Sequence, residues 1–264
     1  MPIRVTKTHA FGNDFLLVPA DDATDADAAA LSVSLCDRHQ GVGGDGVIFY
    51  KVSPQAATMR LVNADGSPSE LSGNGVRCLA ALVAREQHLA TGATVTAYTD
   101  AGTKTLELLA VSDGRFTFRA ALGPPTDLRQ MAIPVLGETL TASVLRMGNP
   151  QCVVLGPLPD LDYFNRFGPA LATHSLFPEG TNVEFAHVEA PDRVRILIWE
   201  RGVGPTMASG TGASASAVAA AAHGGAARTS DVIAPGGTQR VEWREDGVYL
   251  TGWAEVVFEG QWLK

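Results

Sequence analysis

Hydrophobic and polar residues follow two periodicities along this chain, and both halves of the chain repeat them in the same order. Segment 193–199, Arg-Val-Arg-Ile-Leu-Ile-Trp, alternates as a half-buried strand does, whereas apolar runs behind a small polar residue predict helices. In the first half, strands are predicted at 3–5, 15–18, 47–50, 59–62, 94–99, 104–109 and 115–120, and helices over 25–36 and from 73 to about 88. In the second half, strands are predicted near 141–147 and 152–155, again between the two helices, where 193–199 is the clearest, and three times between 231 and 258, with the helices near 161–174 and over 213–222. Each half therefore has the order ββαββαβββ, which predicts a duplicated α/β protein.

Two short segments carry the duplication most clearly. Ser72-Gly-Asn-Gly and Ser209-Gly-Thr-Gly each stand before a helical run, and the two serines are 137 positions apart, about half the chain. A small polar residue followed by Gly-x-Gly leaves a side chain and backbone N–H groups open at a helix N-terminus, which suits an anion. Two such helix ends predict a pocket with one reactive position on each face, as an enzyme that inverts a carbon centre needs.

Turn signals locate the boundary between the halves and the start of the first helix. Segment 122–126, Leu-Gly-Pro-Pro-Thr, divides the chain into an N-terminal α/β domain over 1–122 and a C-terminal α/β domain over 123–264. The tail of the second domain is able to pack back on the first. Thr24, with Asp27 three residues later, resembles the capped start of the helix over 25–36.

Composition narrows the class of protein. The chain has 264 residues, is 45% hydrophobic and carries a net charge of −8, which argues against general nucleic-acid binding. Its first residues show no apolar signal core, and no run reaches the ~20 apolar residues of a membrane span. Cys36, Cys78 and Cys152 form an odd, scattered set without a disulfide framework. We expect a soluble, reduced, cytoplasmic protein with no membrane or nucleic-acid partner.

A glycine-rich loop suggests a dinucleotide site and the histidines suggest a metal site, but the sequence favours neither. Segment 41–46 matches GxGxxG, but a dinucleotide site needs a strand before these glycines and a helix after them. Here a predicted helix precedes them and a predicted strand follows, so the loop is read as a tight connection. The six histidines have no metal-ligand spacing, and we expect no metal and no cofactor.

Amide and charged side chains in turns form a second group of candidates. Each asparagine alone is explained by its preference for turns, whereas together with the serine loops they would make an amide lining for a zwitterion. Glu200 and Arg201, at a predicted strand end, are either a solvated ion pair or a grip for an ammonium and a carboxylate. The candidate asparagines are Asn13, Asn63, Asn74, Asn149 and Asn182.

Taken together, these segments resemble the diaminopimelate epimerase family, whose members are amino-acid racemases that work without pyridoxal phosphate. The ordered set is specific and covers nearly the whole chain. It consists of HAFGNDF at 9–15, DRHQGVGGD at 37–45, NADGS at 63–67, SGNGVRC at 72–78, MGNP at 147–150, GTNVE at 180–184, and ERGVG at 200–204 followed by SGTGA at 209–213.

The resemblance implies a fold, a reaction and a site. It implies two pseudo-symmetric domains, each a strongly curved, barrel-like mixed sheet around a central helix, with the active site in the cleft between them. It implies interconversion of LL- and meso-diaminopimelate by two-base α-proton transfer, in lysine and cell-wall precursor synthesis, by a homodimer. Ser72 and Ser209 take the catalytic positions, and the implied substrate-binding residues are Asn13, Asn63, Gly73, Asn74, Asn149, Asn182, Glu200, Arg201, Gly210 and Thr211.

The chain departs from the family where the chemistry is done. Ser72 and Ser209 stand where the family has its two catalytic cysteines, and Gln151 stands where it has a histidine. A thiol titrates near ~8.5 and works as base or acid near neutrality, whereas an unaided serine hydroxyl does not ionise there. Three readings stay open: paired engineered substitutions, a natural serine epimerase with activating groups elsewhere, and a divergent homologue. The last would catalyse another isomerisation or a dehydration, or bind an amino acid without turnover.

Overall fold

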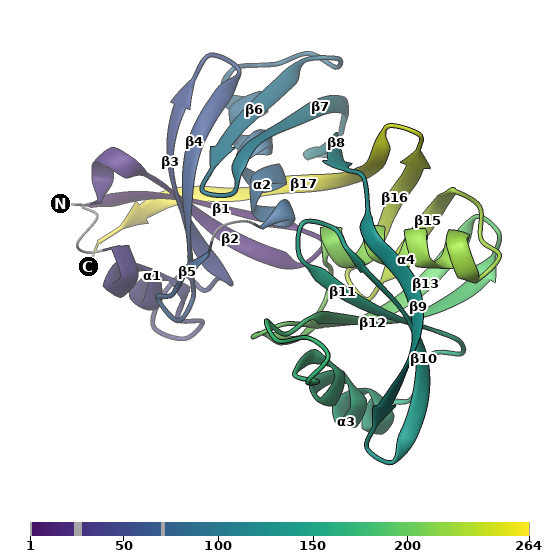
Figure 1. The fold of residues 1–264 in the computed structure, drawn as a ribbon. Helices are drawn as coiled ribbons and strands as arrows, with labels where there is room; N and C mark the ends of the chain where they lie inside the picture. The colour runs from purple at the N-terminus through teal and green to yellow at the C-terminus, as the bar shows by residue number, and fades with distance from the viewer. Residues whose placement is uncertain (1, 24–27, 70–71, 264) are drawn as a thin grey trace. The chain divides into compact units, whose positions relative to one another are not determined.

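A computed structural model describes residues 2–23, 28–69 and 72–263, which form two compact units (Figure 1). The first unit contains residues 1–120 and 252–264, and the second contains residues 121–251. The helix predicted over 25–36 is α1, Ala28–Cys36, and the proposed cap at Thr24 and Asp27 lies outside the described residues.

The first unit is a ring of strands around one helix. Its sheet runs β17–β1–β2–β3–β4–β6–β7–β8, and β8 pairs again with β17, so the ring closes. Neighbours are antiparallel except β2–β3 and β4–β6, which are parallel. The central helix α2, Gly73–Glu86, packs against β1, β2, β3, β4, β6 and β7, whereas α1 packs against β3 and β4. The strands are β1 (Ile3–Ala10), β2 (Asn13–Pro19), β3 (Gly46–Ser53), β4 (Ala56–Asn63), β5 (Pro68–Ser69), β6 (Thr94–Thr99), β7 (Gly102–Ser112), β8 (Arg115–Gly123) and β17 (Gly247–Trp262), with a short 3₁₀ turn η1 at Ala20–Asp22.

The second unit repeats this plan. Its strands run β9–β10–β11–β12–β13–β15–β16–β17, again antiparallel except at two steps, β11–β12 and β13–β15. The central helix α4, Gly210–His223, packs against β10, β11, β12, β13, β15 and β16, and α3, Leu161–Ala172, packs against β9, β12 and β13. The strands are β9 (Thr126–Val135), β10 (Glu138–Arg146), β11 (Pro150–Leu155), β12 (Asn182–Ala190), β13 (Arg193–Glu200), β14 (Gly204–Thr206), β15 (Thr229–Ala234) and β16 (Gly237–Arg244).

The two units are therefore equivalent element by element, and the predicted duplicated α/β fold is confirmed. The parallel steps fall at the same places, β2–β3 against β11–β12 and β4–β6 against β13–β15. The order ββαββαβββ omits three strands. Strands β5 and β14 have only two and three residues, and β9 is largely exposed, with buried residues only at Ile133 and Val135 near its end.

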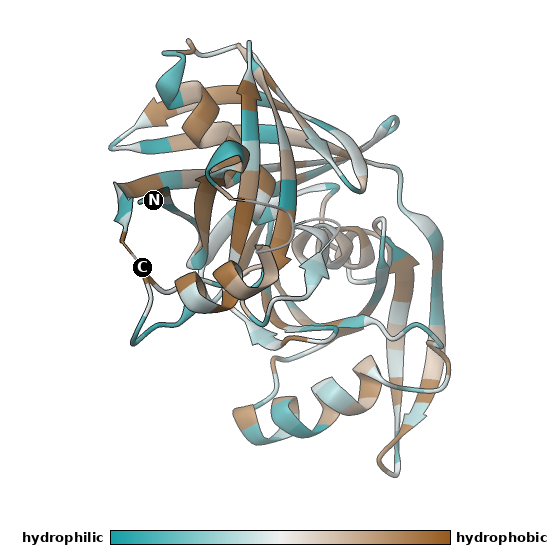
Figure 2. Cartoon of the chain, turned by 90° about the vertical axis from the view of Figure 1, so that its left-hand side faces the viewer, coloured by the Kyte–Doolittle hydropathy of each residue, from teal (hydrophilic) through white to brown (hydrophobic). Residues whose placement is uncertain are grey.

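Alternation along each strand separates two apolar cores (Figure 2). In the second unit, Val183 and Phe185 of β12 face the core under α3. The next residue on β12, Ala186, faces the core around α4. That core holds alanines along α4, and small side chains let a helix pack closely against the surrounding strands. The position of α4 is thus set by its packing on β10, β11, β12, β13, β15 and β16.

The predicted helix-to-strand loop joins α1 to β3 and satisfies the end of α1. The N–H groups of Val42 and Gly43 donate to the Leu35 carbonyl, and that of Gly44 donates to the Cys36 carbonyl. A Cβ at Gly41 would lie 2.4 Å from the Ser34 carbonyl oxygen, so only glycine fits there. The glycines therefore end a helix and do not begin one. Over the described part of the chain no helix is long and apolar enough to cross a membrane.

Candidate active site

Ser72 caps the central helix of the first unit. Its backbone is extended, at φ −128° and ψ 121°, and its Oγ accepts a hydrogen bond of 3.1 Å from the N–H of Gly75. A Cβ placed at Gly73 would meet no atom within 4 Å, so the backbone at the first helical residue lies open. The hydroxyl and the first turn of α2 are positioned together by this cap.

Amide side chains continue the site from Ser72. Asn74, which is buried, donates through Nδ2 to Oδ1 of Asn13 at 3.1 Å. Asn13 in turn donates to a carboxylate oxygen of Asp45 at 2.7 Å. The guanidinium of Arg77 donates to Oδ1 of Asn74, so Asn74 is held from both sides. We call Asn13, Ser72, Gly73 and Asn74 the Ser72 half-site.

A charged network beside Asn13 holds its strand. Asp14 accepts hydrogen bonds from Lys7 and, at 2.8 and 3.2 Å, from Arg38. Burial opposes ionisation of Asp14, but these hydrogen bonds outweigh it and lower the pKa of Asp14 to about 2. Arg38 also bonds Asp45 at 2.8 Å, so the carboxylate that receives Asn13 is fixed as well.

Asn63 lies at the end of β4 and closes a turn. Its Nδ2 donates to Oγ of Ser67 at 3.0 Å, and its carbonyl accepts from the N–H of Gly66. Within the described residues, the side chain of Asn63 makes this turn contact and no hydrogen bond to the Ser72 half-site. Its place as the β-ladder partner of Gly46 still puts it beside the loop that carries Asp45.

Ser209 caps α4 in the same geometry. Its φ and ψ are −135° and 128°, and its Oγ accepts from the N–H of Gly212 at 3.2 Å. The hydroxyl of Thr211 lies 3.5 Å from that of Ser209. Ser209 and Gly210 are buried. Each predicted catalytic serine is thus the N-cap of a central helix.

Beneath the start of α4 lies a carboxyl group that the sequence analysis missed. A Cβ built at Gly212 would lie 2.6 Å from Oε1 of Glu184 and 3.2 Å from Cβ of Ser209. Glu184 is 0% exposed, and neither carboxyl oxygen has a hydrogen-bond partner among the residues that the structure describes. Burial, and then the charge of Glu200, raise the pKa of Glu184. We call Glu184, Ser209, Gly210 and Thr211 the Ser209 half-site.

Two further predicted residues lie at adjoining strand ends in the second unit. Gln151 of β11 and Asn182 of β12 are partners in a parallel ladder, and both are buried. Gln151 donates through Nε2 to Oδ1 of Asn149 at 2.6 Å, while its own Oε1 is buried without a partner. Asn182 accepts through Oδ1 from the N–H of Arg201 at 2.8 Å. Asn149, Gln151, Asn182 and Arg201 are therefore linked through adjoining backbone and side chains.

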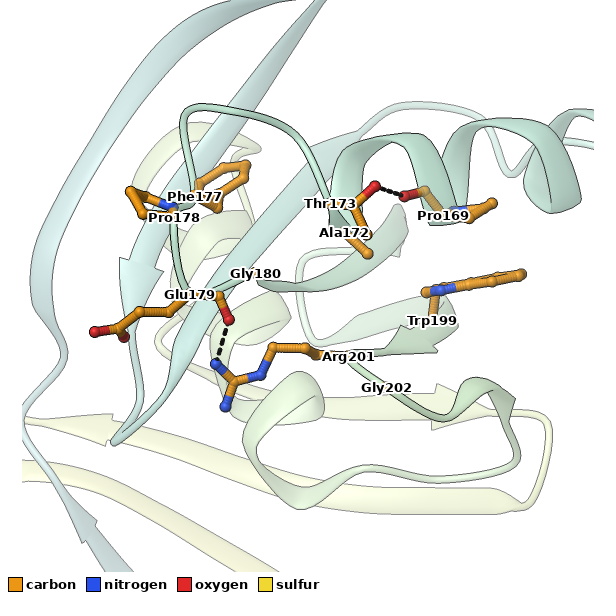
Figure 3. A pocket seen from close by; sticks show the side chains of 10 residues that line it. All are labelled: Pro169, Ala172, Thr173, Phe177, Pro178, Glu179, Gly180, Trp199, Arg201 and Gly202. Atoms are coloured by element: carbon orange, nitrogen blue, oxygen red, sulfur yellow. Dashed lines mark hydrogen bonds between the residues drawn. The ribbon is translucent and has the colours of Figure 1, made fainter.

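The side chains of Glu200 and Arg201 each have a hydrogen-bond partner in the second unit. A carboxylate oxygen of Glu200 accepts from the hydroxyl of Thr206 at 2.8 Å. The guanidinium of Arg201 donates to the backbone carbonyl of Glu179 at 2.7 Å and borders a cavity of about 380 Å³ beside α3 (Figure 3). That cavity is lined by Pro169, Ala172, Thr173, Phe177, Pro178, Glu179, Gly180, Trp199, Arg201 and Gly202.

The remaining titratable candidates are buried in the cores. Cys36, Cys78 and Cys152 are free and buried, and desolvation raises the pKa of the Cys78 thiol to about 12. Cys78 therefore does not replace a thiolate at position 72. Within the described residues, no group of three His, Cys, Asp or Glu side chains is placed to hold a metal ion.

Each unit thus offers a hydroxyl at a helix N-terminus, where backbone N–H groups and the helix dipole favour a carboxylate or an enolate-like charge.

Comparison with known proteins identifies relatives of this chain over nearly its whole length. The family model for diaminopimelate epimerase matches residues 5–125 and 143–257. Diaminopimelate epimerase of Desulforudis audaxviator is 42% identical, covering 98% of this chain and 99% of its own. The enzyme of that name from Microcystis aeruginosa is 39% identical, covering 98% and 99%.

Solved structures share the fold at much lower identity. A predicted epimerase from Pseudomonas aeruginosa superposes with a TM-score of 0.75 at 16% identity and covers 99% of each chain. A probable proline racemase from Agrobacterium radiobacter gives 0.74 at 16% identity, covering 99% of this chain and 93% of that one. The sequence matches and the duplicated fold with its paired caps lead to one assignment: the chain belongs to the diaminopimelate epimerase family.

Proposed function

We propose that this protein interconverts LL- and meso-diaminopimelate by moving the α-proton between two faces of one carbon. The observation that carries the proposal is the pair of equivalent caps, Ser72 on α2 and Ser209 on α4, each with Oγ held by the third N–H of its helix. One serine takes the α-proton and the other delivers a proton to the opposite face. The reaction needs the two half-sites to act on one substrate.

Binding of the reacting end uses the helix starts. The first N–H groups of a helix have no intrahelical acceptor, so those of Gly73, Asn74, Gly210 and Thr211 are suited to the substrate carboxylate. The same donors stabilise the negative charge that develops when the α-proton leaves. The polar groups elsewhere on the substrate are assigned to Asn13, Asn63, Asn149, Asn182, Glu200 and Arg201.

The proposed epimerase function also suggests the reaction class, the pathway and the cellular location of the protein. The protein is an isomerase of lysine and cell-wall precursor synthesis that uses no pyridoxal phosphate, no other cofactor and no metal. We place it in the cytoplasm, acting as a homodimer on a free small-molecule amino acid, with no nucleic-acid or membrane partner.

Solvent deuterium exchange tests the proposal. LL-, meso- and DD-diaminopimelate, with L- and D-lysine as comparison substrates, are incubated with the protein in deuterated buffer. We expect deuterium at the α-carbon of diaminopimelate together with formation of the other epimer. Binding without exchange would leave an amino-acid-binding homologue, and exchange confined to another substrate would assign another isomerisation.

A further inference from the structure

The two half-sites share a backbone but differ at one buried position. A Cβ at Gly75, in the first turn of α2, would lie 3.0 Å from Cδ1 of Ile48. The equivalent Cβ at Gly212, in the first turn of α4, would lie 2.6 Å from Oε1 of Glu184. Ile48 lies on β3 and Glu184 on β12, which are equivalent strands. A carboxyl group beneath one serine thus replaces the hydrocarbon beneath the other.

Packing alone does not explain this carboxyl group. Ile48 shows that a hydrocarbon side chain fills the equivalent place, and burying an unpaired ionised carboxylate is costly. Glu184 nevertheless has no exposed surface and no partner for either oxygen. A buried, unpaired titratable group next to a reactive position indicates a role in proton transfer.

The surroundings of Glu184 favour a proton-carrying role. The charge that acts on Glu184 is that of Glu200, at the end of β13, and Glu184 in turn helps to raise the pKa of the Cys152 thiol on β11. The hydroxyls of Ser209 and Thr211 lie at the start of α4. Burial and the charge of Glu200 both raise the pKa of Glu184, so its carboxyl both accepts and returns a proton closer to neutral pH than an ordinary glutamate does.

We propose that Glu184 is the positioning residue that accepts the hydroxyl proton of Ser209 and returns it, making Ser209 a working base. The proposal deepens the proposed function and rests on it. The hydrogen bond from Gly212 uses a lone pair of Ser209 Oγ and leaves the hydroxyl proton free to be donated. Glu184 receives that proton across one water, because its oxygens make no direct hydrogen bond to Ser209.

The proton count balances in both directions. As the substrate Cα–H bond breaks, its proton bonds to Ser209 Oγ, the original Oγ–H bond breaks, and the Glu184 carboxylate becomes a carboxylic acid. The electron pair stays on the substrate as an enolate-like carbanion. In the reverse direction Glu184 protonates Oγ, Oγ protonates the carbanion, and Glu184 is again a carboxylate.

The test uses the full-length protein and three variants. Glu184→Gln keeps the shape and removes the base, Glu184→Asp keeps a carboxyl group on a shorter arm, and Gln239→Leu is the control. Gln239 is also buried, unpaired and in the second unit, on β16, so its replacement reports the effect of removing a buried polar group. Initial deuterium exchange into LL- and meso-diaminopimelate is measured separately between pH 6 and pH 9, with substrate binding by calorimetry.

We expect Glu184→Gln to slow exchange of one epimer by about 100-fold or more, the usual range for a general base. Exchange of the other epimer and substrate binding change little, and the pH dependence set by the carboxyl group disappears. Glu184→Asp restores part of the rate and of that pH dependence, and Gln239→Leu exchanges like the starting protein.

Three results would overturn the inference, and they separate it from the proposed function. If the starting protein exchanges and Glu184→Gln keeps its rates and pH profile, only the role of Glu184 is wrong. The same holds if Glu184→Gln slows both epimers equally together with weaker binding, because the residue is then structural. If the starting protein binds diaminopimelate without any exchange, the proposed function fails and the role of Glu184 fails with it.

Discussion

At the scale of single residues, each cap serine both stabilises the start of its helix and supplies the hydroxyl proposed for proton transfer. Ser72 and Ser209 each hold the third N–H of their helix, and a thiol accepts that hydrogen bond less well than a hydroxyl does. A thiol is, however, the stronger acid by several pH units. Replacing the serine oxygen by sulfur is therefore expected to weaken the helix cap slightly and to make proton transfer easier.

The double variant Ser72→Cys with Ser209→Cys is expected to raise the rate of α-proton exchange in diaminopimelate by at least about 10-fold. Each single variant should raise it much less, because each face of the carbon needs its own acid or base and the two act as a unit. Exchange in deuterated buffer across all four proteins, with binding measured in parallel, checks this. A double variant that binds substrate and exchanges no faster would direct attention to Gln151.

Glu184 also makes stability depend on pH. Its folded-state pKa is raised above the 4.5 usual for the unfolded chain, so between these two pH values the folded protein holds a proton that the unfolded chain has lost. The free energy of unfolding therefore falls as pH rises through that window, by up to about 1.4 kcal/mol per pH unit. Urea unfolding from pH 5 to pH 8 should show this loss in the starting protein and not in Glu184→Gln. Parallel stability curves for the two proteins would contradict a buried, raised carboxyl group.

The sequence identified the serines, the asparagines and the Glu200–Arg201 step because each stands in a turn or at an element end with a recognisable pattern. It did not identify Glu184 or Arg77, which lie inside a strand and a helix. Arg77 is 2% exposed and in a helical run reads as a surface charge. Only the approach of α4 to β12 shows that Glu184 lies beneath Ser209.

At the scale of elements, the first turn of each central helix must come close to a strand. The glycines at 75 and 212 allow it, because a side chain there would meet Ile48 or Glu184. Helix and strand order was predictable from alternation, whereas β9 was not, since most of its residues are exposed and its apolar face, Met131, Ile133 and Val135, is confined to its second half. The predicted ends of β7, β10 and β17 were too short by several residues, because hairpin partners extend strands beyond their apolar segments.

Gly212→Ala is expected to destabilise the protein by about 1–3 kcal/mol, as overpacking does, because its Cβ meets Oε1 of Glu184 at 2.6 Å. In a Glu184→Ala background most of that cost should disappear, giving a coupling free energy of at least about 0.5 kcal/mol in a double-mutant cycle. Gly75→Ala is the matched substitution in α2 and should show no coupling to Glu184→Ala. Additive effects of Gly212→Ala and Glu184→Ala would mean that the two residues do not touch.

At the scale of the whole molecule, the last strand, β17, pairs with the first strand, β1. Residues 255–262 of β17 pair with residues 3–9 of β1, from Ile3 opposite Trp262 to His9 opposite Glu255. The earlier part of the same strand pairs with β16 in the second unit. The possibility that the C-terminal tail packs on the first half was open from the sequence, because short β-strand signals do not show which strand they will join.

Deletion of residues 256–264 should therefore damage the first unit and spare the second. Without this partner, β1 becomes an edge strand with unpaired N–H and C=O groups. Hydrogen exchange followed by mass spectrometry should show loss of protection over residues 3–9, whereas β12 and β13 remain protected. Equal loss in both units, or none in β1, would contradict independent closure of the two rings.

The path of β17 also determines how far apart along the chain the strand partners of each unit lie. Residues 121–251 of the second unit are contiguous, so its strands meet without help from the rest of the chain. The first unit instead pairs Ile3 with Trp262, close to the two ends of the sequence. The entropic cost of closing a loop rises with its length. Closure of the first unit at β1 therefore depends on its most distant strand pair, and we expect it to follow formation of the second unit.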